Sequence, residues 1–320
     1  MSEQEPVCGE AQGCANIALI KYMGKRDPDG NIAFNPSLSY TLPHLKTTVT
    51  VSAAPSGPDR WEPLAAAGSI PMRLSPQGER RFLGYVRKLC NRWGHAQNVI
   101  VRSANNFPAD AGIASSASSF CAATRAVAAF LRRDESAMEL ARLSRTGSGS
   151  SCRSFFDPWC VWDGDSIDAF AFPVGRPMHM VVIVDGGRKS VSSSDAHSRV
   201  ASSAHFSGRA DRARARMNQL LAALEASDWR GAYQVCSDEF DDMHELFHRS
   251  DPPFRYRTAG SDRIVSDCAD LWAADGDGPI VTMDAGPNVH LLFRRDQEAL
   301  LAKLYERYSR SYPVLSSEAA

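Results

Sequence analysis

NFPADAGIASSAS, Asn106 to Ser118, is the stretch that decides the fold. A proline and a glycine precede small residues, and a helix is expected from Ser115, with an apolar face made by Phe120, Ala123, Val127 and Leu131. Backbone N–H groups at such a helix start bind phosphate together with the helix dipole. A helix capped by Ser115 or Ser116 is an equal alternative. The spacing is neither GxxxxGK[ST] nor GxGxxG, so the usual nucleotide-binding folds are not supported.

The next informative stretch is GSGSSCRS, Gly147 to Ser154, which puts one arginine among glycines and small hydroxyl residues. Glycine and serine let the backbone approach an anion closely, and the guanidinium of Arg153 can grip it with two parallel hydrogen bonds. By itself such a stretch is more often a polar turn with a surface arginine. Arg153 is therefore a candidate anion-binding residue.

In NIALIKYMGK, Asn16 to Lys25, successive side chains are expected to alternate between the two faces of a β-strand. The alternation sends Asn16, Ala18 and Ile20 to one face, and Ile17, Leu19 and Lys21 to the other. A lysine buried beside apolar neighbours is costly unless it meets a carboxylate or a ligand anion. The alternative is a strand end where Lys21 and Lys25 are solvated.

DAGPN, Asp284 to Asn288, follows the apolar run Ile280 to Met283, so Asp284 is expected at the end of a strand. Aspartate before Gly-Pro is also common in ordinary β-turns, where its oxygens accept backbone hydrogen bonds. A carboxylate held beside a lysine stays ionised, as a proton acceptor must.

Length and charge limit the classes of function. The chain has 320 residues, more than one hydrophobic core usually serves, so two domains are expected. Its 43% hydrophobic and 23% charged fractions are ordinary, and the net charge of -1 gives no broad basic field for nucleic acid. Any anionic ligand must be held by locally placed cations.

The cysteines and the N-terminus indicate a cytoplasmic protein. The eight cysteines are scattered, with no CxxC pair and no histidines at zinc spacing, and are expected as buried thiols. The leader MSEQEPVCGEAQG is acidic where a signal peptide is basic and then apolar. No run approaches the roughly 20 apolar residues of a membrane span.

Hydrophobic periodicity predicts mixed α and β structure. Strands are expected at 17–22, 47–53, 98–102, 178–184, 280–283 and 289–293. Helices are expected at 79–93, from 115, from about 134, and at 211–226, 229–247 and 264–274. Residues 55–68 are expected as a surface loop, and 188–208 as a serine-rich loop. A smaller α+β domain should start near residue 175.

Together the four motifs resemble the mevalonate diphosphate decarboxylases of the GHMP kinase superfamily, in family order, over about residues 14 to 295. The resemblance implies an α+β, two-domain GHMP kinase fold. An N-terminal domain of GHMP type (1–174) would carry the ATP phosphate loop, and a C-terminal ferredoxin-like domain (175–320) would follow. The active site, with ATP and Mg²⁺, would lie in the cleft between them, in a homodimer.

The resemblance also implies site residues, by motif. As catalytic residues it implies Asp284, Lys21, Arg153, Ser116 and Asn16. For the substrate it implies Tyr22, Lys25, Ser148, Ser150, Arg153 and, from the segment KSVSSSDAH, Ser192 and Ser193. For ATP it implies Asn106, Pro108, Gly112, Ala114, Ser115 and Ser116, with Ser116 also beside the metal. The sequence departs from the family at Met23, where tryptophan is usual, and at Asp110, Ser118 and Ser119.

The implied activity is the ATP-dependent decarboxylation of mevalonate 5-diphosphate to isopentenyl diphosphate, releasing ADP, phosphate and CO₂. Three alternatives stay open: the same reaction on the 5-monophosphate, a mevalonate-type kinase that does not decarboxylate, and a non-enzymatic paralogue that binds an anionic metabolite. Arg26, Lys25, Arg188 and Lys189 could serve a diphosphate or be solvated at the surface.

Overall fold

The first sheet is built on one long strand that pairs along both of its edges. The computed structural model describes residues 8–27, 30–65, 68–70, 74–108, 113, 115–187 and 190–318. Its six-stranded sheet has the order β5-β6-β4-β7-β8, with β1 paired to β4. The strands are β1 (Cys8–Ile20), β4 (Ser37–Ala53), β5 (Arg60–Pro63), β6 (Val99–Asn105), β7 (Trp159–Asp163) and β8 (Ser166–Phe170). Only β5 and β6 pair in parallel.

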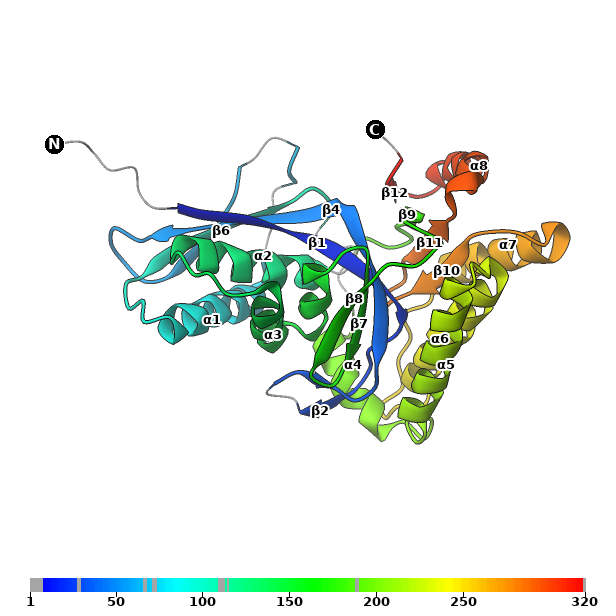
Figure 1. Ribbon diagram of the computed structural model, residues 1–320, viewed down its shortest axis with the longest axis horizontal. Coiled ribbons are helices and arrows are strands. Elements are labelled where there is room, and N and C mark those ends of the chain that lie inside the picture. Colours follow the sequence, from blue (N-terminus) through cyan, green and yellow to red (C-terminus); the bar gives the residue numbers. More distant parts are fainter. Residues whose placement is uncertain are drawn as a thin grey trace.

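Three helices cover one face of this sheet (Figure 1): α1 (Pro76–Arg92), α2 (Ser115–Phe130) and α3 (Ala137–Gly147). Helix α2 approaches β1 closely because β1 has glycines where the helix crosses it. A Cβ at Gly9 or Gly13 would lie 2.3 Å from a carbonyl oxygen of α2, closer than such atoms can come. These glycines therefore set how deeply α2 packs against the sheet.

The second sheet lies in the C-terminal half and is antiparallel throughout. Its order is β10-β11-β9-β12, from β9 (Met178–Val182), β10 (Ile280–Met283), β11 (Val289–Phe293) and β12 (Val314–Ser316). The larger helices of this half are α5 (Arg209–Glu225), α6 (Trp229–His248), α7 (Ala259–Asp275) and α8 (Glu298–Ser309). Figure 1 shows α5 and α6 side by side along this half.

Several short elements complete the structure. Strands β2 (Lys25–Asp27) and β3 (Ile32–Ala33) pair with each other, and helix α4 (Ser193–Arg199) follows β9. Three short 3₁₀ helices are η1 (Gly149–Phe155), η2 (Val200–Ser202) and η3 (Arg295–Gln297). The described residues include no helix long and apolar enough to cross a membrane.

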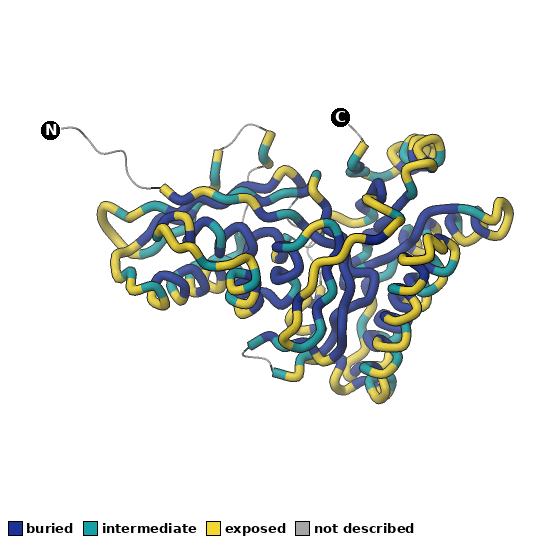
Figure 2. Tube along the Cα trace, in the orientation of Figure 1, coloured by how far each residue is buried: buried dark blue, intermediate teal, exposed yellow. Residues whose placement is uncertain are grey.

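The two halves share one hydrophobic core. Apolar residues of β1 and β4, such as Ile17 and Leu38, are buried in the same cluster as Val181 of β9 and Leu220 of α5. Figure 2 shows this buried layer running through the strands, with exposed residues on the outer sides of the helices. The end of β1 is thus held at the junction of the halves.

Most of the periodic segments form the predicted elements, with four corrections. The segment 55–68 contains strand β5, because its Arg60–Pro63 pairs with β6. The segment 188–208 contains α4 and η2 rather than only loop. Strand β1 ends at Ile20, so the predicted strand residue Lys21 lies beyond it. Cys8 is exposed and Cys14 partly so, whereas the other six thiols are buried and all eight are free.

Some strands were not predicted from the sequence. Strands β7, β8 and β12 lie in segments where the apolar pattern is short, whereas helix α8 is the helix expected after the strand pair 280–293. Two of these strands pair with strands distant in sequence, β7 with β4 and β12 with β9, whereas β8 forms a hairpin with β7. Tertiary pairing therefore supplies what the local pattern lacks.

Candidate active site

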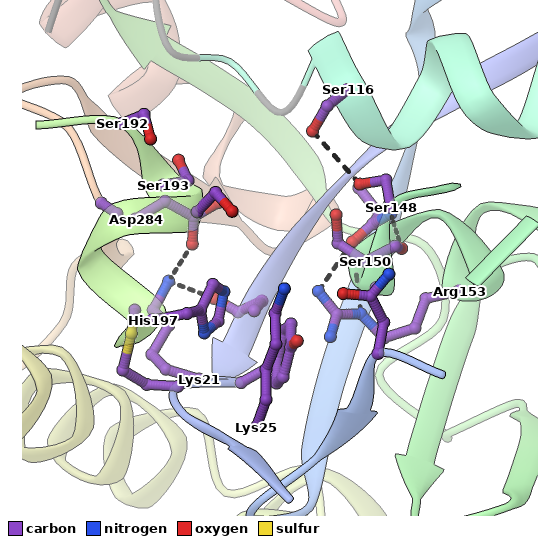
Figure 3. Close-up of a pocket in the computed structure, with 18 of the residues that line it drawn as sticks. Lys21, Lys25, Ser116, Ser148, Ser150, Arg153, Ser192, Ser193, His197 and Asp284 are labelled. Carbon is purple, nitrogen blue, oxygen red and sulfur yellow. Dashed lines mark hydrogen bonds and ion pairs between the residues drawn. The ribbon is translucent and has the colours of Figure 1, made fainter. Parts of the chain in front are cut away.

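A cavity of about 390 Å³ collects most of the predicted residues. Its wall includes backbone and side chains from the end of β1, the start of α2, the 3₁₀ helix η1, helix α4 and the turn after β10. Figure 3 labels ten of the lining residues, with Ser116 and Ser148 on one side and Ser192, Ser193 and Asp284 on the other. The lining residues are Asn16, Ala18, Lys21, Tyr22, Met23, Lys25, Asn31, Arg81, Ser115, Ser116, Ser148, Gly149, Ser150, Arg153, Ser192, Ser193, Ser194, His197, Met243, Asp284 and Ala285.

An irregularity at the end of β1 turns Lys21 into this cavity. The register with β4 shifts between Ala18 and Ile20, so strict alternation ends there. As a result Ile20 joins the core and Lys21 lines the cavity with Asn16 and Ala18. The predicted face for Lys21, shared with Ile17 and Leu19, is therefore wrong, because the prediction assumed an unbroken strand.

Lys21 is buried and pairs with Asp284 across the two halves. Its Nζ lies 2.8 Å from Asp284 Oδ1 and donates to the Ala18 carbonyl oxygen at 2.5 Å. The Lys21 side chain is 1% exposed, whereas the Asp284 carboxyl is 29% exposed and faces the cavity. Burial by itself raises the pKa of Asp284, but the Lys21 ammonium outweighs it and holds that pKa below its usual range. The carboxylate is thus ionised and open to a ligand.

A second group of charges holds the backbone of Lys21. Glu239 on α6 accepts a hydrogen bond from the Lys21 N–H at 2.9 Å, and Arg209 on α5 donates to its carbonyl oxygen at 3.0 Å. Arg209 also pairs with Glu239 and with Asp242, and all three are buried. Both backbone groups of Lys21 are therefore bound by side chains, which fixes where its ammonium lies.

Arg153 lies deep in the cavity wall with a prepared set of partners. Its Nη2 donates to Asn16 Oδ1 at 3.2 Å, and its Nη1 donates to Ser37 Oγ at 2.8 Å. The Asn16 amide is itself fixed, because its Nδ2 donates to Ser154 Oγ at 2.8 Å. Within the described part of the chain no carboxylate pairs with Arg153, although the residue is 3% exposed. A buried guanidinium of this kind needs an anion from a ligand.

The start of α2 forms the opposite wall. Ser115 and Ser116 stand in its first turn, where the helix dipole and backbone N–H groups favour an anion. The first turn holds no acidic residue that would occupy this end. The Ser148 hydroxyl lies 3.4 Å from the Ser116 hydroxyl, and Arg81 of α1 donates to the carbonyl oxygen of Gly147 at 2.7 Å.

Gly149 of η1 and Tyr22, which follows β1, are in close contact in the lining of the cavity. A Cβ at Gly149 would lie 2.8 Å from the Tyr22 ring, so only glycine fits there. The Tyr22 ring also packs at 4.8 Å from Trp162 and at 4.3 Å from His197, centroid to centroid. Met23, at the position where tryptophan is usual, is buried and lines the cavity near Met243 and Ala285.

The structure brings together every predicted catalytic and substrate residue, and two of the predicted ATP residues, Ser115 and Ser116. It does not bring Asn106 and Pro108 into the lining. Instead the Asn106 side chain accepts from the Lys46 N–H at 2.7 Å and donates to the His44 carbonyl oxygen at 2.8 Å. Gly112, Ala114, Asp110, Arg188 and Lys189 lie outside the described residues. Arg26 is described but does not line the cavity.

Four lining residues with polar or charged side chains were missed by the sequence analysis: Asn31, Arg81, Ser194 and His197. Arg81 lies on the predicted helix 79–93, but nothing in its local pattern distinguishes it from a solvated arginine. His197 belongs to the segment KSVSSSDAH, which was noted only for its serines. Its position four residues after Ser193, on the same face of a helix, is a signal that could have found it.

The wall is strongly biased towards positive charge. Of the described residues, four cationic side chains line it, Lys21, Lys25, Arg81 and Arg153, against one carboxylate, Asp284, which Lys21 already pairs. Burial lowers the pKa of Lys25, and Arg81 nearby adds to that effect. An anionic ligand would relieve this repulsion, so the cavity suits a molecule with more than one negative group.

Protein ligands for a metal are few in this cavity. Among the described residues no group of three or more histidine, cysteine, aspartate or glutamate side chains could hold a metal ion. The Ser116 hydroxyl at the helix start is an oxygen ligand of the kind Mg²⁺ accepts, and Mg²⁺ bound with phosphates commonly takes most other ligands from phosphate oxygens and water. The residues therefore fit a metal that arrives with a phosphate ligand.

Known proteins resemble this chain over almost its whole length. Residues 13–171 match the model of the diphosphomevalonate decarboxylase-like N-terminal domain, and residues 179–317 match the mevalonate 5-diphosphate decarboxylase C-terminal domain. The diphosphomevalonate decarboxylase of Aspergillus fumigatus is 31% identical over 89% of this chain and 76% of its own length.

Solved structures give the same picture. A mevalonate diphosphate decarboxylase from Legionella pneumophila is 42% identical, with a TM-score of 0.89 over 96% of this chain and 100% of its own. A structure of MDDEF in complex with MVAPP, AMPPCP and magnesium is 28% identical, with a TM-score of 0.86 over 98% of this chain and 97% of its own. These likenesses confirm the predicted two-domain α+β fold of GHMP kinase type.

Proposed function

The chain belongs to the diphosphomevalonate decarboxylase family, and we propose from this premise that it decarboxylates mevalonate 5-diphosphate in an ATP-dependent reaction. The products are isopentenyl diphosphate, ADP, phosphate and CO₂. The observation that carries the proposal is the Lys21–Asp284 pair, which presents a carboxylate to a cavity whose other described charged lining residues are cations. An acceptor for a hydroxyl proton and sites for anionic groups thus lie in one cavity.

Asp284 orients the 3-hydroxyl of the substrate and accepts its proton. Its Oδ1 is bound by Lys21, whereas Oδ2 accepts from no other group in the described ranges. The lowered pKa keeps the carboxylate ready as an acceptor at neutral pH. Lys21 holds Asp284 in place and offsets negative charge that develops on the transferred phosphoryl group.

Ser116 and the start of α2 bind the phosphates of ATP, with Arg81 also in the cavity lining. ATP bound with Mg²⁺ supplies the phosphoryl group that converts the 3-hydroxyl into a leaving group. Ser116 would hold the metal through its hydroxyl. The small residues at this wall let the backbone approach the phosphates closely.

Arg153 holds the C1 carboxylate of the substrate. Asn16 and Ser37 occupy three of its five N–H donors, so both terminal nitrogens keep a hydrogen for the ligand. When phosphate leaves C3, positive character grows there, and the held carboxylate keeps its carbon–carbon bond aligned for the loss of CO₂. Ser148, Ser150, Tyr22 and Lys25 line the remaining surface for the substrate.

The alternatives make different products. A kinase of this superfamily would release ADP without CO₂, a phosphomevalonate decarboxylase would prefer the 5-monophosphate, and an anion-binding paralogue would turn over neither. The homodimer implied by the resemblance and the cytoplasmic location indicated by the cysteines and the N-terminus remain predictions.

An assay of the purified protein with ATP and Mg²⁺ separates these functions. Mevalonate 5-diphosphate and 5-phosphate are supplied in turn, and ADP and CO₂ are measured together. We expect equal amounts of ADP and CO₂ from the diphosphate, with a higher kcat/KM than from the monophosphate. ADP without CO₂ would identify a kinase, and no ADP from either substrate would overturn the enzymatic proposal.

A further inference from the structure

His197 on α4 is a cavity residue that the proposed reaction does not yet use. Its ring lies against Tyr22, with the centroids 4.3 Å apart, and its Nδ1 accepts a hydrogen bond from the Gly24 N–H at 3.1 Å. Figure 3 shows the imidazole among the lining side chains, near Lys21 and Lys25. Helix α4 therefore places a ring nitrogen in the middle of a cationic wall.

The contact with Gly24 fixes which nitrogen carries the hydrogen. A backbone N–H can only donate, so Nδ1 must be the acceptor and a neutral ring carries its hydrogen on Nε2. Burial lowers the pKa of His197 to about 3, and Lys25 and Arg153 add to the effect, so the ring is neutral at physiological pH. Among the described residues, the one hydrogen bond of the His197 ring is the contact of Nδ1 with Gly24.

A neutral N–H donor at this position can bind an anion without adding to the repulsion among the cations of the cavity. Lys25 and Arg153 already put positive charge around the ring, and a further cation would add to the repulsion when the cavity holds no ligand. A neutral N–H adds a hydrogen bond to an anion without that cost. A ligand that is too short to reach the N–H leaves this buried donor without an acceptor, and such a ligand binds more weakly. The donor therefore discriminates between ligands of different length.

We propose that His197 donates a hydrogen bond from Nε2 to the terminal phosphate of the substrate and thereby favours the 5-diphosphate over the 5-monophosphate. This inference rests on the proposed function. It assigns the carboxylate end to Arg153 and the phosphate end to the side of the cavity formed by Lys25, His197 and the first residues of α4. His197 is thus a specificity-determining residue.

Two substitutions separate the two nitrogens of the ring. In His197→Asn the side-chain oxygen can replace Nδ1 and keep the Gly24 contact, but no donor reaches the place of Nε2. In His197→Gln the longer amide can put an N–H at the place of Nε2, but the Gly24 contact is lost. Each variant is therefore the control for the other.

We expect His197→Asn to raise the KM for mevalonate 5-diphosphate about tenfold or more, with kcat changed less than about threefold, because a hydrogen bond to a charged group is lost. His197→Gln should stay within about threefold of the wild type in both. The KM for the 5-monophosphate and for ATP should change little in either variant. The preference of the wild type for the diphosphate should therefore shrink in His197→Asn alone.

The opposite pattern, with His197→Gln impaired and His197→Asn normal, would overturn the proposal. It would show that the ring matters because it accepts the hydrogen bond from Gly24. A rise in the KM for ATP alone would also overturn it, because the phosphate bound would then be that of the nucleotide. Calorimetric titration of wild type and both variants with mevalonate 5-diphosphate measures the same contact without turnover. Failure of the proposed function, seen as wild-type protein that binds the diphosphate but releases no CO₂, is thereby distinguished from failure at His197.

Discussion

Two buried groups of charged residues meet at Lys21, and they differ in what is left open. The Asp284 carboxyl has one bound oxygen and is 29% exposed towards the cavity. Glu239, by contrast, is 0% exposed and accepts from the Lys21 N–H, Arg209 and Arg216. A carboxylate whose acceptor sites are filled can only support the structure, whereas one with a free oxygen can also act on a ligand.

The comparison also separates two ways of holding a lysine. The Asp284 side fixes the charge of Lys21, and the Arg209–Glu239 side fixes its backbone. Breaking the first should therefore affect chemistry, and breaking the second should affect folding.

The largest effect is expected from Asp284→Asn. The amide is nearly isosteric but cannot accept the hydroxyl proton, so kcat should fall about 10³-fold or more. The free energy of unfolding should change by no more than about 2 kcal/mol, and substrate affinity by less than about tenfold, because Arg153 remains. Single-turnover release of CO₂ and denaturant unfolding on one preparation measure both. Turnover above about a tenth of wild type would remove Asp284 from the chemistry.

Next in size is the loss of stability in Arg209→Met. The substitution leaves Glu239 and Asp242 buried without their shared cation, and removing one partner of a buried pair costs about 3 kcal/mol or more. Urea unfolding measures the change. The matched control is Arg216→Met, because Arg216 contacts the same two carboxylates with a side chain that is 20% exposed and should lose only about 1 kcal/mol. Equal losses in the two variants would contradict the distinction between buried and partly exposed partners.

A smaller effect is expected when the structural group is titrated. Burial raises the pKa of Asp242, but Arg209 and the neighbouring donors outweigh it and hold the pKa at about 2. The folded pKa lies below the unfolded value of about 3.9, so this carboxylate stabilises the fold above that value and the contribution is lost as the pH falls towards 2. The loss should be about 2 kcal/mol.

Asp242→Asn supplies the reference for this titration. Its free energy of unfolding, followed from pH 5 to the lowest pH at which the protein still folds, should fall less steeply than that of the wild type. Identical slopes would show that Asp242 does not titrate with a lowered pKa.

The smallest effect is expected from Arg153→Lys, on the cavity side of the comparison. Lysine keeps the charge but loses the planar fork that bonds Asn16 and Ser37, so kcat should fall at least about tenfold, or about 1.4 kcal/mol, with folding intact. Steady-state kinetics and thermal unfolding are measured together. Near-normal kcat would mean that charge alone, rather than bidentate geometry, is needed at this position.

Much of the fold could be predicted because its signals are local. The apolar periodicity at 79–93 and 229–247 gives α1 and α6, and the run 289–293 gives β11. The missed strands β7 and β12 are held by pairing with distant strands, which no local window contains. The helix α4 was missed because serine-rich composition conceals its short apolar contact at Ala196.

For the site, the order of the four motifs along the chain was enough to mark Lys21, Ser116, Arg153 and Asp284 as candidates. How these side chains lie relative to one another follows only from the folded structure. The shift in register near Ala18 turns Lys21 into the cavity, and the contact with Gly24 makes His197 a donor. The physical reason is that a motif is recognised from the order of residues alone. The burial of a side chain, its ion pairs and the tautomer of a histidine depend on groups that are distant in sequence and meet only after folding.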